Sequence, residues 1–208
     1  NCVIEKGFDA VTIGSVEKFI TDTAWAQGWV KPIQPRRERA ESVGIIGAGP
    51  AGLAAAEQLR RKGYQVAIYD RYDRVGGLMI YGIPNFKLEK DIVQRREKLL
   101  RDSQVAFHLD CEVGRDISLE ELRRRHGAVL IATGVYKARD IAAPGVGLPG
   151  IAAALDYLTA SNRSGLGDSV PGIDSGALHA EGKNVVVVGG GDTAMDCVRT
   201  AVRQGAKS

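Results

Sequence analysis

The stretch Val43-Gly-Ile-Ile-Gly-Ala-Gly-Pro-Ala-Gly52 decides the fold of this chain. Its apolar start predicts a buried strand, its glycines predict a tight turn, and the following pattern predicts a helix that ends at Gly63. The same pattern returns 142 residues later as Val185-Val-Val-Val-Gly-Gly-Gly-Asp-Thr-Ala194, with a helix end at Gly205. Each copy predicts a unit that binds the pyrophosphate of a dinucleotide. Two copies predict two dinucleotides, and therefore electron transfer between them.

Three small positions in each copy have separate physical tasks. The first permits a sharp turn away from the strand, and the second lets backbone approach a phosphate closely because glycine has no Cβ. The third must be small so that the helix can pack on the strand. Free amides and the positive end of the helix dipole then face the phosphate. These positions are Gly47, Gly49 and Gly52 in the first copy and Gly189, Gly191 and Ala194 in the second.

The first copy carries a further mark of a dinucleotide site. Residues 64–69 have the pattern of the next strand, and Asp70 follows them, 23 residues after Gly47. A carboxylate at that place can accept hydrogen bonds from the adenosine ribose. The alternative is a nucleotide-free doubly wound fold that uses its glycines for packing alone. It weighs more for the second copy, because the strand that would carry the matching acid is not within the 208 residues.

The composition excludes several functional classes. The 208 residues are 44% hydrophobic and 25% charged, which permits one large or two small domains with real cores. The formal net charge of +3 is too small to predict nucleic-acid binding, and no apolar run approaches the ~20 residues of a membrane span. Three scattered cysteines form no disulfide framework and no secretory signal is visible, so we expect a cytoplasmic protein.

The remaining periodicity completes an α/β fold of the Rossmann-like class with a parallel sheet. Residues 128–134 are an apolar run closed by glycine, as expected of a buried parallel strand. The other expected elements are helices at 15–29, 88–103, 119–125 and 152–159, strand-like stretches within 105–113, a loop at 71–84 and a long surface loop at 162–182.

Five motifs in series resemble one family. They are the first glycine turn, then Tyr69-Asp-Arg-x-x-x-x-Gly-Gly-Leu78, Gly82-Ile-Pro-x-Phe-Lys-Leu-Glu-Lys90, Ala132-Thr-Gly134 and Gly189-Gly-Gly-Asp-Thr-Ala-Met-Asp-Cys197. Together they resemble the small (beta) subunit of bacterial NADPH-dependent glutamate synthase, over essentially the whole chain. The later motifs are far more specific than either glycine turn.

The resemblance implies an NADPH-dependent FAD oxidoreductase. NADPH in the second unit would give hydride to FAD in the first, and electrons would leave through iron–sulfur clusters to the large (alpha) subunit that makes L-glutamate from glutamine and 2-oxoglutarate. FAD suits this task because it accepts electrons in pairs and releases them singly. Two alternatives stay open: a related FAD/NADPH module that serves another acceptor, as in dihydropyrimidine dehydrogenase or a ferredoxin-linked enzyme, and a binding module that transfers no hydride.

The resemblance also implies a domain organisation. Residues 1–40 would be an approach segment that follows an iron–sulfur region, and 41–150 the first part of the FAD domain. Residues 151–182 would be a helix and connecting loop, and 183–208 the start of an NADPH domain that interrupts the FAD domain. The chain looks like a piece of such a protein, and we expect residues 1–208 alone to bind FAD weakly or to fold incompletely.

The FAD contacts that the resemblance implies come from several segments. The turn would hold the pyrophosphate, Asp70 the ribose, and Val113 would pass the adenine as a backbone contact. Lys87 could lie near the flavin ring and stabilise the negative charge of reduced flavin; the alternative is a surface lysine at a helix start. The full set is Gly47, Gly49, Pro50, Ala51, Gly52, Asp70, Arg71, Gly76, Gly77, Leu78, Lys87, Val113, Thr133 and Gly134.

The NADPH pyrophosphate would meet the second turn. An acid is awkward beside a phosphate, so we expect Asp192 to cap the helix through its carboxylate. The residues implied are Gly189, Gly190, Gly191, Asp192 and Thr193.

The cysteines divide into one metal candidate and two core candidates. In the family, Asn-Cys-Val-Ile-Glu closes a cysteine-rich motif, so the resemblance implies that Cys2 is the last ligand of a 4Fe–4S cluster. Glu17 is a weaker second candidate for a cluster ligand. The alternative role for Glu17 is a charged residue on an exposed helix face. One cysteine cannot hold a cluster that needs about four thiolates, so we expect this chain alone to bind none. Cys111 and Cys197 lack a Cys-x-x-Cys partner, which disfavours a flavin disulfide reductase.

Overall fold

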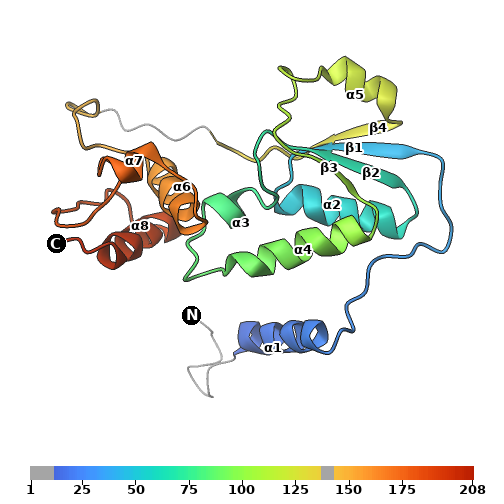
Figure 1. The fold of residues 1–208 in the computed structure, drawn as a ribbon, viewed down its shortest axis with the longest axis horizontal. Coiled ribbons are helices and arrows are strands. Elements are labelled where there is room, and N and C mark those ends of the chain that lie inside the picture. The colour runs from blue at the N-terminus through green and yellow to red at the C-terminus, as the bar shows by residue number, and fades with distance from the viewer. Residues whose placement is uncertain (1–11, 137–142) are drawn as a thin grey trace. The chain divides into compact units, whose positions relative to one another are not determined.

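The computed structural model describes residues 12–136 and 143–208 (Figure 1). It divides into two compact units, residues 1–32 and 33–208. The first contains helix α1, Ile13–Ala26, which confirms the helix expected there. Within the described residues, no helix combines the length and the apolar character that crossing a membrane requires.

The second unit is built on a four-stranded parallel sheet in the order β3-β2-β1-β4. Its central strand β1 pairs with β2 on one side and with β4 on the other, so that Ile45 lies between Ile68 and Leu130. This arrangement confirms the α/β fold with a parallel sheet. The strands are β1 Ser42–Ile46, β2 Gln65–Tyr69, β3 Ala106–His108 and β4 Ala128–Ile131.

Alternate residues of the strands face opposite sides of the sheet, and each side has its own core. Val66 and Ile68 belong to a buried cluster with residues of α2 (Pro50–Arg61) and α4 (Lys90–Asp102). Tyr69 belongs to a second cluster with Leu122 of α5 (Leu119–Arg125). Figure 1 shows α2 and α4 together on one side of the sheet and α5 on the other. The bounds of α5 are those expected from the sequence.

A group of helices follows the sheet along the chain. It consists of α6 (Ala154–Gly165), α7 (Pro171–Asp174) and α8 (Asp192–Arg203), and α6 packs against both α8 and the short helix α3 (Leu78–Tyr81). The expectation of a surface loop at 162–182 was therefore wrong in part. Residues 162–165 continue α6, and buried Asn162 donates a hydrogen bond from Nδ2 to the backbone oxygen of Tyr81, at 2.8 Å. This long-range contact stabilises one more turn of helix.

The second glycine turn is not preceded by the strand that the sequence predicts. Residues 183–190 form no strand, and Val186 and Val188 are 87% and 77% exposed. The segment has a backbone neighbour only at its start: the Val185 N–H donates to the Ser208 oxygen, and the Lys207 N–H donates to the Lys183 oxygen, each at 2.8 Å. A strand needs such pairing along its length, and within the described residues no strand lies beside 186–190. The apolar pattern therefore continues through Val186 and Val188 without the pairing that would bury it.

The strand β4 is also less buried than its composition suggests. It forms as predicted, but Leu130 is 40% and Ile131 64% exposed. Within the described residues β4 is an edge strand with β1 as its single neighbour. The expectation of a buried strand was wrong, because an apolar run does not distinguish a central strand from an edge strand.

Both helix ends expected after the glycine turns are confirmed. Gly63 and Gly205 have φ angles of +88° and +86°, in the left-handed region that favours glycine. The residue after each glycine donates its N–H back to the helix, Tyr64 to Leu59 and Ala206 to Ala201, at 3.2 and 3.0 Å. The two copies therefore end in the same way, by the glycine-terminated helix motif.

Candidate functional site

The first glycine turn is shaped by close backbone contacts. Gly47 has a φ angle of +111°, and a Cβ there would lie 2.4 Å from the backbone oxygen of Ala132. A Cβ on Gly52 would lie only 1.9 Å from the backbone oxygen of Gly47. Both positions therefore require glycine, the first for its turn and the second for the approach of α2 to the strand end, as the sequence predicts.

The mouth of α2 is open to a ligand. Gly49 is the N-cap of the helix, and the first intrahelical bond runs from the Leu53 N–H to the Gly49 oxygen, at 3.0 Å. The amides of Ala51 and Gly52 precede that bond, so they have no acceptor within the helix. A Cβ on Gly49 would meet no described atom within 4 Å. This cradle of bare amides with open space in front of it fits the pyrophosphate of a dinucleotide.

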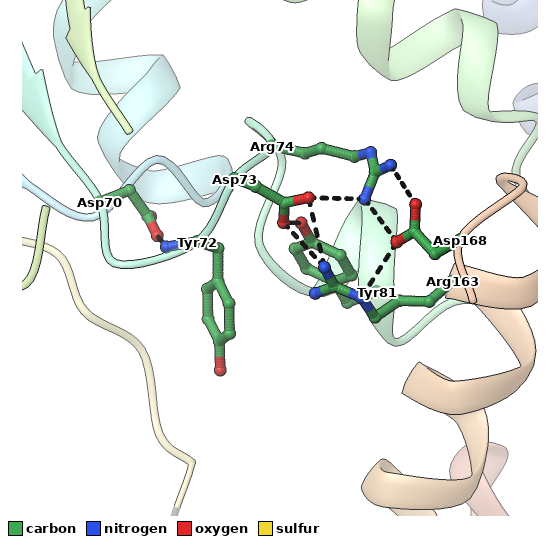
Figure 2. A network of polar contacts seen from close by, with 7 residues as sticks. All are labelled: Asp70, Tyr72, Asp73, Arg74, Tyr81, Arg163 and Asp168. Carbon is green, nitrogen blue, oxygen red and sulfur yellow. Dashed lines mark hydrogen bonds and ion pairs between the residues drawn. The ribbon is translucent and has the colours of Figure 1, made fainter. Parts of the chain in front are cut away.

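Asp70 supports the same turn from the end of β2. Its carboxylate accepts the Ala48 N–H at 2.6 Å and the Tyr72 N–H at 2.9 Å, and the residue is 9% exposed. Figure 2 shows the carboxylate directed at the Tyr72 amide. Each carboxylate oxygen accepts more than one hydrogen bond, so these contacts leave lone pairs for a ribose hydroxyl. The ribose contact stays a prediction, and the bracing of the turn is an additional role.

Two further segments lie against the first turn. The Gly76 N–H donates to the Ala48 oxygen at 2.9 Å, and a Cβ on Gly77 would lie 3.0 Å from the Gly49 Cα. Past the end of β4, Ala132 donates to the Ile46 oxygen at 2.8 Å, which brings the segment of Thr133 and Gly134 to the same edge. Leu78, at the start of α3, is 40% exposed. The structure therefore gathers most of the predicted FAD residues at one end of the sheet.

An aromatic group beside this turn was not predicted. The Arg71 guanidinium lies over the Tyr72 ring at 4.9 Å and over the Tyr136 ring at 4.7 Å. The Tyr136 hydroxyl is 3.8 Å from the place where a Gly77 Cβ would lie, and burial raises the pKa of that hydroxyl. A tyrosine two residues after Ala132-Thr-Gly134 is the only sequence signal that could have indicated it.

Val113 and the two metal candidates, Cys2 and Glu17, belong to other segments of the chain. Val113 packs in the cluster around Tyr69, and the Cys111 N–H donates to the Asp70 backbone oxygen at 2.9 Å, which brings this segment to the strand end. Cys2 lies outside the described residues. Glu17 is exposed on α1. Within residues 12–136 and 143–208, no three ligand-type side chains are grouped as a metal ion would require.

The second glycine turn has the same helix mouth as the first. Gly189 has a φ angle of +144°, Gly191 is the N-cap of α8, and the Met195 N–H donates to the Gly191 oxygen at 3.1 Å. Gly190 and Thr193 are exposed beside it. The expectation that Asp192 caps the helix was wrong: Gly191 takes the N-cap place and has no side chain, and α8 shows no side-chain cap bond. Asp192 is instead the first helical residue, and it is exposed.

Lys87 is paired with an acid that the sequence analysis missed. Its Nζ donates to both carboxylate oxygens of Asp196, at 2.9 and 3.1 Å. Asp196 lies on the second turn of α8, and its side chain is only 8% exposed. The two residues are 109 positions apart, so the only sequence signal was the second acid of the Gly189–Cys197 motif.

A network of charges joins the loop after β2 to α6 and the residues beyond it (Figure 2). Arg74 makes a two-bond contact with Asp168 at 2.8 and 2.6 Å, and Arg163 of α6 contacts both Asp73 and Asp168. The Tyr81 hydroxyl donates to Asp73. The hydrogen bonds from Arg74 hold the pKa of the Asp168 carboxyl below its ordinary value. This network ties the helical group to the loop that carries Gly76 and Gly77.

Lys90 binds backbone carbonyls in α3 and just after it. It is 7% exposed, and its Nζ donates to the backbone oxygens of Met79, at 3.0 Å, and of Ile83. These carbonyls stand at the end of α3, where they lack partners within the helix. Burial lowers the pKa of Lys90 to about 8.

The buried lysine predicts a pH dependence of stability. Lys90 releases its proton near pH 8 when folded and near 10.5 when unfolded, so the unfolded chain binds more protons between these values. The free energy of unfolding should therefore rise with pH through this window, by up to about 3 kcal/mol from this group. Urea unfolding of wild type and Lys90→Met at pH 7 to 10 measures this effect. The free energy of unfolding of wild type minus that of the variant should increase with pH. A constant difference contradicts the prediction.

Comparison with known proteins agrees with this geometry. A family model described as pyridine nucleotide-disulphide oxidoreductase matches residues 41–208. The glutamate synthase (NADPH) small chain of Azospirillum brasilense is 70% identical over 209 residues, which cover 100% of this chain and 43% of the relative. A putative glutamate synthase (NADPH) small chain of Cereibacter sphaeroides is 66% identical, with 100% and 50% covered. The chain thus spans half or less of the length of these relatives.

A solved structure is similar as well. Mycobacterium tuberculosis FprA in complex with NADPH is 28% identical with a TM-score of 0.65, over 77% of this chain and 36% of FprA. These comparisons together confirm the resemblance to glutamate synthase small chains and the Rossmann-like fold, and they place residues 41–208 in an oxidoreductase family.

Proposed function

The chain belongs to the pyridine nucleotide-disulphide oxidoreductase family, and from this we propose that it is the dinucleotide-binding part of a glutamate synthase small subunit. The observation that carries the proposal is the pair of helix mouths. Both α2 and α8 begin at a glycine N-cap with no side-chain cap, so two sets of amides are free for two anionic ligands. The high identity to small chains along the whole of this sequence supports the choice within the family.

The first mouth would hold FAD. The amides of Ala51 and Gly52 would bind its pyrophosphate, Asp70 would accept a ribose hydroxyl, and Gly76–Gly77 would let the cofactor pass close to the loop. When bound, FAD would take a hydride, two electrons with one proton, from NADPH and leave NADP⁺. The protein contributes position, exclusion of water and electrostatics.

The second mouth would hold NADPH, with the amides of Asp192, Thr193 and Ala194 toward its pyrophosphate. Electrons would then pass to a large subunit that makes L-glutamate from glutamine and 2-oxoglutarate, as the relatives' name "small chain" supports. The iron–sulfur part of the path, with Cys2 as a ligand, rests on the resemblance alone. A cytoplasmic location is likewise proposed from composition.

The test uses the full-length protein. We expect it to be purified yellow with one FAD per chain, and NADPH added without oxygen should bleach the flavin absorbance within seconds. Addition of the large subunit, glutamine and 2-oxoglutarate should then restore the yellow colour as glutamate forms.

Three other outcomes would point elsewhere. A preparation without flavin contradicts the proposal. Bleaching without re-oxidation by the large subunit favours an oxidoreductase with a different acceptor. Bound FAD that NADPH does not reduce favours a binding module.

A further inference from the structure

We propose that Lys87 and Asp196 are positioning residues that hold α8, the proposed NADPH-binding helix, on the segment between α3 and α4; this inference rests on the proposed function. Lys87 lies in the segment that continues from Gly76–Gly77 and α3, and Asp196 lies one turn into α8. The ion pair therefore joins helix α8, whose N-terminus forms the second cradle, to a segment that continues from the loop packed against the first cradle.

The burial of Asp196 makes this contact a strong constraint. Its side chain is 8% exposed, and the cation placed on it is Lys87, whose Nζ reaches both oxygens at 2.9 and 3.1 Å. A buried carboxylate is costly unless a cation and hydrogen bonds compensate it. Displacing α8 from the loop would leave the carboxylate without this partner, so the pair resists such a displacement.

A second contact fixes the direction of α8 as well as its position. The Arg203 guanidinium lies 3.8 Å above the ring of Phe86, the residue before Lys87. Asp196 and Arg203 are seven residues apart, which is about two turns or roughly 10 Å along the helix. Two contacts on neighbouring residues of one segment therefore hold two separated points of α8, and two points set the line of its axis.

The direction of that axis matters for the proposed reaction. In the proposed function the N-terminus of α8 would bind the nucleotide phosphates, so a small rotation of the helix would move the nicotinamide at the far end of NADPH. Hydride transfer needs the reacting atoms about 3–3.5 Å apart, and a displacement of about 1 Å can cost 100-fold in rate. The network of Arg74, Arg163 and Asp168 holds α6 on the loop before α3, so the helical group is attached at two places.

This role differs from the one that the sequence suggested for Lys87. A lysine that stabilises reduced flavin needs a free positive charge beside the ring, whereas this lysine is neutralised by a buried carboxylate. The two roles predict different consequences for Asp196. If Lys87 acts on the flavin, Asp196 opposes it; if Lys87 acts as a clasp, the two residues act together.

The experiment compares Lys87→Met and Asp196→Asn in the full-length protein loaded with FAD. Lys98→Met is the matched control, because Lys98 makes an exposed pair with Asp102 on α4, at 2.7 Å. We expect both variants to retain FAD and an unchanged flavin midpoint potential, while the rate of flavin reduction by saturating NADPH falls at least 10-fold. The double variant should be no slower than the singles, and Lys87→Arg should recover most of the rate. The control should stay within twofold of wild type.

A second measurement is independent of the reaction. Hydrogen–deuterium exchange of the α8 amides in flavin-free protein should accelerate about 10-fold in both variants and not in Lys98→Met. The proposal is overturned if exchange is unchanged, or if Lys87→Met lowers the flavin potential while Asp196→Asn is reduced at the wild-type rate. If NADPH fails to reduce wild-type flavin, the proposed function fails, and the exchange experiment still decides whether the clasp exists.

Discussion

Gly52→Ala should destroy FAD binding, whereas Ala194→Gly, the corresponding position of the second turn, should be tolerated. A methyl group on Gly52 would stand 1.9 Å from the Gly47 backbone oxygen and 3.3 Å from the Ile45 side chain. Neither the oxygen nor the strand beneath it can move without opening the turn. Helix α2 must therefore shift away from β1, which displaces the amides of the cradle. We expect a loss of about 3 kcal/mol in the free energy of unfolding.

The second turn supplies the control because it has more room. A Cβ on Gly189 would lie 3.3 Å from the Ala194 Cβ, and the helix there already accommodates a methyl group at the third position. Ala194→Gly should therefore cost at most about 1 kcal/mol, the loss of helix propensity. Urea unfolding and the FAD-to-protein ratio measure both effects in the full-length protein. Retention of stoichiometric FAD by Gly52→Ala would show that the turn is not the pyrophosphate site.

Arg60→Met should be the most destabilising change of a charged residue, by about 3 kcal/mol, while Arg61→Met should change stability by less than about 1 kcal/mol. The Arg60 side chain is 3% exposed. It donates to the Ser103 backbone oxygen at 2.7 Å and to both Glu38 oxygens at 2.7 and 2.5 Å. These bonds tie α2 to the end of α4 and to the chain before β1. Removal of the guanidinium leaves a buried carbonyl without a donor.

Arg61 is a matched control because it follows Arg60 directly on α2. Its side chain is 58% exposed, and its pair with Glu57, at 2.7 Å, is an i, i+4 contact on the helix surface. Such exposed pairs contribute little, because solvent screens them and the side chains lose entropy. Urea unfolding at neutral pH compares the two variants. Equal losses would mean that the Arg60 contacts do not persist in solution.

The sequence was most informative where a structure depends on residues close to one another. The first strand, its turn, α2 and the end at Gly63 form as predicted because each signal lies within a few residues of its effect. The helix ends at Gly63 and Gly205 adopt the same conformation for the same reason, since only the left-handed preference of glycine is involved. The fold class follows from these units, because two glycine-turn units predict a parallel sheet covered by helices.

Expectations that required distant partners were less accurate. The four valines at 185–188 are at least as apolar as β1, but strand formation depends on neighbours that composition does not supply. The helix at 152–159 was predicted too short, because the contact of Asn162 with Tyr81 extends it from 81 residues away. Asp192 was expected to cap α8 because an acid is awkward beside a phosphate, although the turn places Gly191 at the cap position.

The sequence by itself determined the two glycine turns, their helix ends and the family, because glycine conformation and helix termination are local properties of the backbone. The tertiary structure alone decided which charges meet: Lys87 with Asp196, Arg74 with Asp168 and Arg60 with Glu38. No local pattern encodes these pairs, since a charged side chain reads the same in sequence whether it faces water or a partner. Only the packing of the helices against the loop after β2 brings each cation to its acid and so sets how the two cradles are held together.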